Sequence, residues 1–363
     1  MPYNNSKNDK VIRYIDLFCG IGGFRIAAEH ISSELGAPTQ CVFSCDIDEK
    51  CQKAYEENFG EKPAGDITTV KNEDIPDHDV LLAGFPCQPF SIIGHRKGFD
   101  DTRGTLFFEI ARILEAKKPT AFVLENVKLL AGHNNGKTLK RIMTALKDLG
   151  YYADFRVLNA LDYGIPQKRE RIFIVGFKKA CSFDWPKSGI SMIPLKDILE
   201  ENVPEQYYAS ERIRKKRLKK QKPTNEPTIW HENKAGHISA YPFSCALRAG
   251  ASYNYLLVNG ERRLTMREML RLQGFPDSFK IVCNYSQTRK QAGNSLPVPV
   301  AKAILKNLFI AQGWNNGDID YSHYDLQHQI IDGQMRVFEK KAEYGKKSKI
   351  KNGREIQAAV SSK

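Results

Sequence analysis

Short apolar segments alternate with amphipathic segments from residue 11 onward, and this rhythm leaves few folds open to the chain. The apolar segments are 11–18, 41–47, 79–85, 121–127 and 171–177. They are continuous rather than alternating in polarity, which is typical of strands buried on both faces of a parallel sheet. The amphipathic segments between them, at 24–35, 49–59, 106–117 and 137–150, have the pattern of helices. We therefore expect a doubly wound, mostly parallel α/β sheet that helices cover on both faces.

The rhythm breaks after residue 183. A strongly basic run at 211–223 gives way to an irregular stretch, rich in Tyr, Ser, Asn and Gly, that reaches about residue 260. Residues 288–310 then predict a turn and an amphipathic helix that returns to the first domain. The expected division is a first domain over 1–183 completed by 288–315, a smaller second domain over 184–287, and a basic, mobile tail over 316–363.

The charge balance favours a polyanionic partner. The 363 residues contain 55 Lys and Arg against 42 Asp and Glu, which gives a formal net charge of +13. Basic side chains neutralise phosphates and release their counterions, so nucleic acid fits this balance. A solvated basic surface fits the same count and stays open as an alternative.

The composition indicates neither a membrane segment nor a metal site. No apolar run approaches the roughly 20 residues that cross a bilayer, and residues 1–10 lack the apolar stretch of a signal peptide. The eight cysteines include no Cys-x-x-Cys pair, so zinc ligands and a disulfide framework lack their usual spacing. We therefore expect reduced thiols, no metal and a cytoplasmic protein.

The stretch "DLFCGIGGF" at 16–24 predicts a strand, a glycine turn and the start of a helix. It lacks the third glycine of the dinucleotide fingerprint, and Asp16 stands where a carboxylate would repel a pyrophosphate. A carboxylate suits a ligand with a positive group, such as the amino group of a methionine moiety. Asp46, at the end of the next strand, suits ribose hydroxyls. The pattern indicates S-adenosylmethionine, with an ordinary α/β turn as the alternative.

Six motifs in one order resemble the DNA (cytosine-5) methyltransferases of bacterial restriction-modification systems. They are "DLFCGIGGF", "GFPCQPFS" at 84–91, "ENV" at 125–127, "QKRER" at 167–171, "RRLTMREMLRLQGFPDSF" at 262–279 and "GNS" at 293–295. The likeness covers roughly residues 11–178 and 260–310. It implies that the first domain is catalytic and binds S-adenosylmethionine, that S-adenosylhomocysteine is the product, and that the second domain recognises the target.

The resemblance also implies the catalytic residues. Cys87, held between Pro86 and Pro89, would add to C6 of cytosine and so activate C5. Glu125 would hold a proton and bond the N3 and N4 edge of the base, and Arg171 would bind its O2 oxygen. Arg169 is placed to support the site or to contact a phosphate. Without the other motifs, a buried inert cysteine would be the simpler interpretation of Cys87.

The cofactor contacts follow from the matched positions in the same way. We expect Phe18, Gly20, Ile21, Gly22 and Gly23 around the methionine part, Asp46 on the ribose, Asp66 and Ile67 on the adenine, and Pro86, Leu106 and Asn294 closing the pocket. Ile47 departs from the family, because some relatives have an aromatic residue there that stacks on the adenine.

The expected partner is double-stranded DNA, with the enzyme acting as a monomer on a cytosine flipped out of the base stack. The glycine-rich stretch 91–108 predicts a loop that closes over DNA and contributes Ile93, His95, Arg96 and Lys97. The candidates for reading base edges are Arg248, Ser252, Tyr253 and Asn254. The basic run at 211–222 is expected to contact phosphates or to form a solvated helix face.

Three other functions agree with parts of the sequence. A tRNA cytosine-5 methyltransferase shares the catalytic motifs, but the Cys-Phe-Thr signature usual in its recognition segment is missing. A catalytically silent DNA-binding regulator would need an added helix-turn-helix domain, for which about ten residues before the first strand leave no room. An NAD-dependent oxidoreductase is disfavoured by the glycine pattern and by Asp16. The expected host is a bacterium or a phage.

Overall fold

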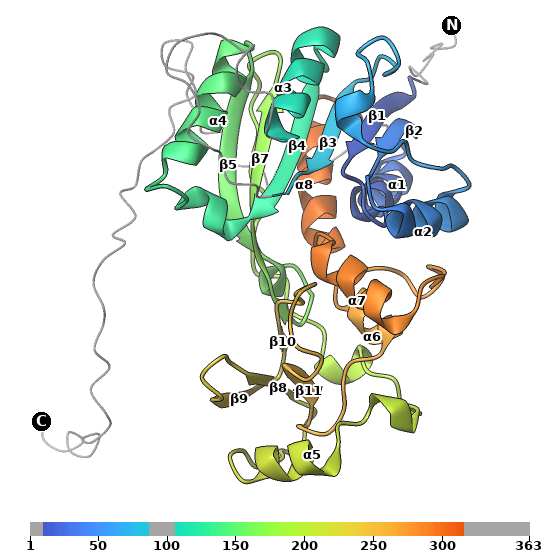
Figure 1. Cartoon of the computed structure of the whole chain (residues 1–363). Coiled ribbons are helices and arrows are strands. Elements are labelled where there is room, and N and C mark those ends of the chain that lie inside the picture. The colour runs from blue at the N-terminus through green and yellow to red at the C-terminus, as the bar shows by residue number, and fades with distance from the viewer. Residues whose placement is uncertain (1–9, 87–105, 316–363) are drawn as a thin grey trace, which may run out of the picture. The chain divides into compact units, whose positions relative to one another are not determined.

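The computed structural model describes residues 10–86 and 106–315, and all of them belong to one compact unit, residues 1–325 (Figure 1). The predictions for Cys87, Ile93, His95, Arg96 and Lys97 lie outside the described residues, as does the predicted tail over 316–363. No helix among the described residues is long and apolar enough to span a membrane.

A six-stranded sheet forms the centre of the molecule (Figure 1). Its order is β2 (Thr39–Cys45), β1 (Ile12–Leu17), β3 (Val80–Gly84), β4 (Ala121–Val127), β7 (Glu170–Phe177) and β5 (Tyr152–Asn159). Neighbours are parallel from β2 to β4, whereas β7 runs antiparallel to both β4 and β5. The predicted doubly wound, mostly parallel sheet is therefore confirmed.

Helices bury both faces of this sheet. They are α1 (Gly23–Leu35), α2 (Glu49–Phe59), α3 (Leu106–Lys117), α4 (Lys137–Asp148) and α8 (Val298–Ala311). Strand β1 shows how the sequence separates the two cores, because successive side chains of a strand point to opposite faces. Tyr14 packs in one core with residues of α1 and α8, and Ile15 packs in the other with residues of α3 and α4. The last helix, α8, therefore shares a core with α1.

The region after β7 contains a small second sheet that the sequence did not reveal. Strands β11 (Leu256–Val258), β8 (Ile229–Glu232) and β9 (Ile238–Tyr241) pair antiparallel in that order, and β10 (Ser244–Cys245) pairs with β6 (Gln167–Lys168). The helices in this region after β7 are α5 (Glu211–Leu218), α6 (Met266–Arg271) and α7 (Tyr285–Asn294). Within the predicted turn and helix at 288–310, residues 288–294 belong to α7, and residues 295–297 form the short link to α8.

Short 3₁₀ helices complete the described chain. They are η1 (Ile67–Thr69), η3 (Lys128–Ala131), η4 (Ala160–Asp162), η5 (Leu195–Asp197) and η6 (Glu205–Tyr207). Two of them follow strands β4 and β5 directly and so redirect the chain where the sheet ends.

Candidate active site

A cavity of about 530 Å³ lies at the carboxyl ends of β1 to β4, where open α/β sheets bind their ligands. This volume is in the usual range for a small-molecule site. Most of the predicted cofactor contacts line it: Phe18, Gly20, Gly23, Asp46, Ile47, Asp66, Ile67, Pro86, Leu106 and Asn294. The same lining includes Glu125 and Arg171, so the structure brings the predicted cofactor residues and two predicted catalytic residues around one space.

The glycine turn between β1 and α1 shapes one wall. Gly20 and Gly22 have φ angles of 56° and 87°, which glycine adopts at no steric cost. A Cβ atom on Gly22 would lie 2.3 Å from the ring of Phe59, so this position has no room for a side chain. The backbone N–H of Gly20 donates to Oδ2 of Asp46 at 2.8 Å and thereby ties the turn to the end of β2.

Two residues of the predicted cofactor set are not in the lining. The Ile21 side chain is 2% exposed and packs in the hydrophobic core beside α1 and α8. Gly22 lies against Phe59, at the back of the turn. Both residues therefore shape the turn, while the residues on either side of them, Gly20 and Gly23, face the cavity.

Asp16 is the strongest electrostatic feature of the cavity. Its side chain is 1% exposed, and neither carboxyl oxygen makes a hydrogen bond of good geometry within the part of the chain that the structure describes; the backbone N–H of Arg25 has only a weak influence on the carboxyl group. Burial raises the pKa of this carboxyl to about 8, despite the opposing attraction of the Arg25 guanidinium. A buried carboxyl group without a donor suits a ligand that brings a donor or a positive charge with it.

Two further carboxylates follow along the wall. Asp46 accepts backbone N–H groups from Gly20 and from Asp48, both at 2.8 Å, and burial still raises its pKa. A carboxylate has about four lone-pair sites, so Asp46 keeps capacity for ribose hydroxyls. Asp66 caps η1 by accepting from the backbone N–H of Thr68 at 2.9 Å. An ammonium group, a ribose and a base can therefore be bound in this order, and the residues present fit S-adenosylmethionine.

Ile47 forms the exposed edge of the cavity. Its side chain is 72% exposed, and it lies between Asp46 and Asp48 at the end of β2. This exposure leaves that side of the cavity open.

Glu125 and Arg171 form an ion pair on the opposite wall. Arg171 Nε lies 2.9 Å from Glu125 Oε1, and both side chains are largely buried. The strand register explains the meeting, because Glu125 on β4 lies opposite Phe173 of the antiparallel β7, and Arg171 precedes Phe173 by two residues and so lies on the same face. Burial raises the pKa of Glu125, although Arg171 and Arg169 both oppose the shift. The pair therefore offers a carboxyl that is easily protonated next to a fixed cation.

Asn126 holds the chain that leads to Cys87. Its Nδ2 donates to the carbonyl of Phe85 at 2.9 Å, and its own Oδ1 accepts from the backbone N–H of Val127. This side chain is 2% exposed and links the ends of β4 and β3. These hydrogen bonds anchor the chain directly after β3.

Arg169 cannot contact a phosphate, which corrects one of the two roles predicted for it. The side chain is 1% exposed, and burial lowers its pKa. Its guanidinium donates to the carbonyls of Leu247 and Gly293, both at 3.0 Å, and to that of Ser295. Arg169 instead joins the candidate recognition segment to the turn after α7, beside the cavity.

Helix α7 supplies cavity residues that sequence reasoning missed. Lys290 Nζ lies 2.7 Å from Asp48 Oδ2, and Gln291 Nε2 donates to the carbonyl of Lys50 at 2.9 Å. Asp48, Lys290 and Gln291 line the cavity, whereas Lys50 does not. Asp48 had a detectable signal, because it follows Asp46 by two residues at a strand end. The partners on α7 are about 240 residues away, and nothing in the sequence pairs them.

The four candidate DNA-reading residues lie in one loop after Leu247, which we call the recognition loop (248–254). Arg248, Ser252 and Tyr253 are exposed, and Asn254 is half-buried. The guanidinium of Arg248 lies 4.9 Å from the ring centre of Tyr255, whose hydroxyl accepts the Arg248 backbone N–H. The structure therefore presents these four residues together on one loop.

The described residues contain no group of three or more His, Cys, Asp or Glu side chains that could hold a metal ion. All seven cysteines within them are free thiols.

Residues 12–310 match the family described as C-5 cytosine-specific DNA methylase. The chain is 54% identical to type II methyltransferase M.NgoBI of Neisseria gonorrhoeae over 319 residues, covering 86% of this chain and 98% of that one. It is 56% identical to type II methyltransferase M.HaeII of Haemophilus aegyptius over 302 residues, covering 82% and 93%.

Among solved structures, a variant of Spodoptera frugiperda DNMT2 is similar with a TM-score of 0.63 and 21% identity, covering 82% of this chain and 99% of that one. At this identity the structural likeness concerns the fold alone. The family match and the two relatives with more than half of their residues identical agree with the geometry of the cavity. The chain belongs to the C-5 cytosine-specific DNA methylase family.

Proposed function

We propose that this enzyme methylates C5 of one cytosine within a short, specific sequence of duplex DNA, with S-adenosylmethionine as the methyl donor. The observation that carries the proposal is a shared cavity. The carboxylates suited to the donor and the Glu125–Arg171 pair suited to the base line the same space. A methyl group and its acceptor must meet within about 3–3.5 Å, which one common cavity allows.

Bound S-adenosylmethionine would supply the methyl group. Asp16 would accept hydrogen bonds from the amino group, Asp46 would bind the ribose hydroxyls, and Asp66 with Ile67 would bind the adenine. Phe18 and the glycine turn would surround the methionine part, and S-adenosylhomocysteine would remain after transfer. Support comes from the unpartnered carboxyl of Asp16 and from the spare acceptor capacity of Asp46.

Cys87 is the proposed nucleophile. Its thiolate would add to C6 of the cytosine and make C5 electron-rich, and it would leave again once C5 has lost its proton. Glu125, whose pKa burial raises, would donate a hydrogen bond from its protonated carboxyl O–H to N3 and stabilise the charge that addition creates. Arg171 would fix the O2 oxygen of the same ring. Asn126 would position the nucleophile through the Phe85 carbonyl.

The cytosine must leave the base stack, because a thiol cannot reach C6 within the duplex. Unstacking costs about a few kcal/mol, which contacts between protein and DNA must offset. We assign these contacts to Ile93, His95, Arg96, Lys97 and to the recognition loop. Residues 1–183 with 288–315 would then carry the chemistry, and 184–287 the recognition.

The relatives favour duplex DNA over tRNA as the substrate. Those described above are type II methyltransferases from Neisseria and Haemophilus, and the matching family is a DNA methylase. We therefore propose that the enzyme modifies DNA as part of a restriction-modification system in the cytoplasm of a bacterium, or for a phage, and that it acts as a monomer.

Transfer of tritiated methyl groups to duplex DNA tests the proposal. We expect label in DNA and none in tRNA, and bisulfite sequencing of DNA from expressing cells identifies the target. Cys87→Ser should abolish transfer, whereas Cys181→Ser, at a free thiol away from the cavity, should keep it. DNA with 5-fluorocytosine at the target should be trapped on the protein. A fully active Cys87→Ser enzyme, or label in tRNA alone, would contradict the proposal.

A further inference from the structure

Helix α5 does not present all of its basic residues to solvent. Eight of the twelve residues at 211–222 are Lys or Arg. Arg217 is only 1% exposed, whereas its neighbours Lys216 and Lys219 are exposed. A buried arginine needs acceptors for its guanidinium, because leaving these donors unpaired away from water costs free energy. The contacts of Arg217 therefore indicate what this residue does.

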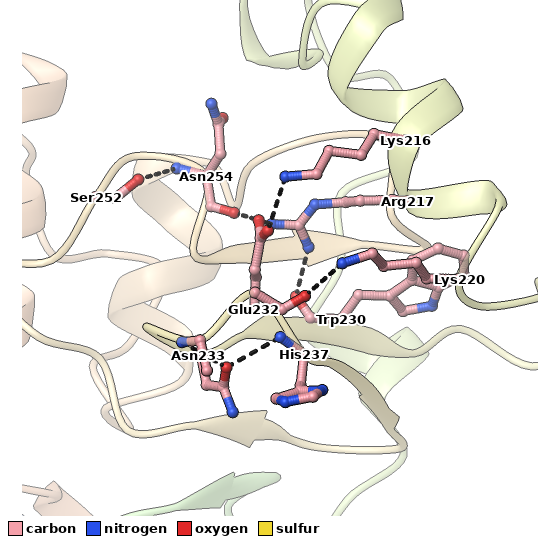
Figure 2. A network of polar contacts seen from close by, with 11 residues as sticks. Lys216, Arg217, Lys220, Trp230, Glu232, Asn233, His237, Ser252 and Asn254 are labelled. Carbon is pink, nitrogen blue, oxygen red and sulfur yellow. Dashed lines mark hydrogen bonds and ion pairs between the residues drawn. The ribbon is translucent and has the colours of Figure 1, made fainter.

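Arg217 binds three groups from two different segments (Figure 2). Its Nη1 donates to the carbonyl of Trp230 at 3.2 Å, and its Nη2 lies 3.2 Å from Oε2 of Glu232, at the end of β8. The same Nη2 donates to the carbonyl of Asn254. One guanidinium thus joins α5, β8 and the last residue of the recognition loop.

Glu232 completes this junction from both its side chain and its backbone. Its Oε1 also lies 3.5 Å from Lys216 Nζ, so two basic residues of α5 converge on one carboxylate (Figure 2). Its backbone N–H donates to the carbonyl of Tyr255 at 3.0 Å, directly after the loop. The end of the loop is therefore fixed at two successive residues, with Asn254 bonded to Arg217 of α5 and Tyr255 bonded to Glu232 of β8.

The rest of the recognition loop is held from α7. Arg289 Nη1 donates to the carbonyl of Ala251 at 2.7 Å, and its guanidinium lies 4.4 Å from the ring centre of Tyr253. The Tyr253 hydroxyl donates to Ser286 Oγ at 3.1 Å. Arg217 on α5 thus holds the end of the recognition loop, while Arg289 and Ser286 on α7 hold its middle.

We infer that Arg217 is a positioning residue for target specificity, which holds the recognition loop through the Asn254 carbonyl and does not contact DNA. This inference rests on the proposed function of the recognition loop. It separates Arg217 from the other cations of α5, such as Lys216, which solvent exposure makes accessible to phosphates. A phosphate contact adds affinity for every sequence and steepens the salt dependence, whereas the placement of a reading loop changes the preference among sequences.

The test compares Arg217→Gln and Arg217→Lys with the wild type. The rate kcat/KM is measured on a duplex with the target found by bisulfite sequencing and on duplexes with each base pair of the target changed in turn. We expect Arg217→Gln to lower the ratio of target to altered-target rates at least tenfold, with Arg217→Lys in between. The slope of log Kd against log salt concentration and the Kd for S-adenosylhomocysteine should stay as in the wild type.

Lys219→Gln is the matched control, because it removes an exposed charge from the same helix. It should keep the ratio. Loss of S-adenosylhomocysteine binding would reveal that Arg217→Gln does not fold. In that case the ratio of target to altered-target rates is measured on Arg217→Lys and Glu232→Gln instead. The inference is wrong if no folded variant changes the ratio, or if all duplexes lose the same factor and the salt slope becomes shallower. A wild type that methylates no duplex would instead contradict the proposed function.

Discussion

Asp16 should make cofactor binding depend on pH in a direction that follows from its burial. The pKa of this carboxyl is raised from 3.8 to about 8 because desolvation outweighs the attraction of Arg25. In the free enzyme the group is therefore mostly protonated at pH 7, and it must lose its proton to pair with an ammonium group. Binding of S-adenosylmethionine should then release a proton, so the affinity falls as the pH falls.

The size of the effect follows from the same value. With a pKa of about 8, the ionised fraction of Asp16 falls from about 9% at pH 7.0 to about 0.3% at pH 5.5, so Kd should rise about 30-fold. The amino group of the ligand stays protonated over this range. Isothermal titration calorimetry in two buffers of different ionisation enthalpy measures both Kd and the protons released, which should number about 0.9 at pH 7.0.

Asp16→Asn separates this effect from damage to the fold. The variant should bind S-adenosylmethionine more weakly at pH 7, and Asp16 should no longer contribute to the pH dependence. Its free form should be more stable than the wild type at pH 8. A carboxyl whose folded pKa is raised stabilises the protein fully below 3.8, and this stabilisation is lost as the pH rises through about 8. If Asp16→Asn keeps the 30-fold dependence, or if binding releases no proton, the reasoning is wrong.

Three further predictions concern the same cavity. Ile47→Trp should lower the Kd for S-adenosylmethionine by about 2–12-fold, as measured by calorimetry. A ring at this 72% exposed position can stack on the adenine, which contributes about 0.5–1.5 kcal/mol. An unchanged Kd would place the adenine elsewhere. Glu125→Gln should slow single-turnover methyl transfer by about 10²–10³ without changing cofactor affinity, and a loss of that affinity alone would contradict its assignment to the base. Gly22→Ala should lower the free energy of unfolding by about 1–3 kcal/mol, since the new Cβ would lie 2.3 Å from the Phe59 ring. Denaturant unfolding measures this loss, and Gly20→Ala, with nothing within 4 Å of its Cβ, should cost less.

The central sheet could be predicted because its strands are buried on both faces. The residues of β3 and the first four residues of β4 form unbroken apolar runs, so the pattern indicates strands and a parallel sheet at once. Strand β5 lies at the edge and alternates irregularly between exposed and half-buried residues, so no run marks it. The strands of the small sheet have three or four residues, which is too short for a period of two to show.

The cavity could be predicted where its residues follow strands in the sequence. Asp46 directly follows β2 and Glu125 lies near the end of β4, and the carboxyl ends of parallel strands meet at one edge of a sheet. The pairing of Lys290 with Asp48 joins residues 242 apart, and only the return of α7 and α8 to the sheet brings them together. Sequence patterns report on neighbours along the chain, so they do not reveal such a contact.

Arginine illustrates the same limit within a single residue type. Arg169, Arg171 and Arg217 all lie in basic motifs, and the sequence alone suits each of them to phosphate or base contact. The structure separates them by burial and acceptor. Arg171 faces the cavity beside a carboxylate, whereas Arg169 and Arg217 are 1% exposed and end on backbone carbonyls of the segments around the recognition loop. Because arginine stays charged when buried and has five donors in a fixed fork, it can join three segments at once. A net charge of +13 therefore overstates the charge available for DNA, and the two buried arginines should not contribute to the salt dependence of binding.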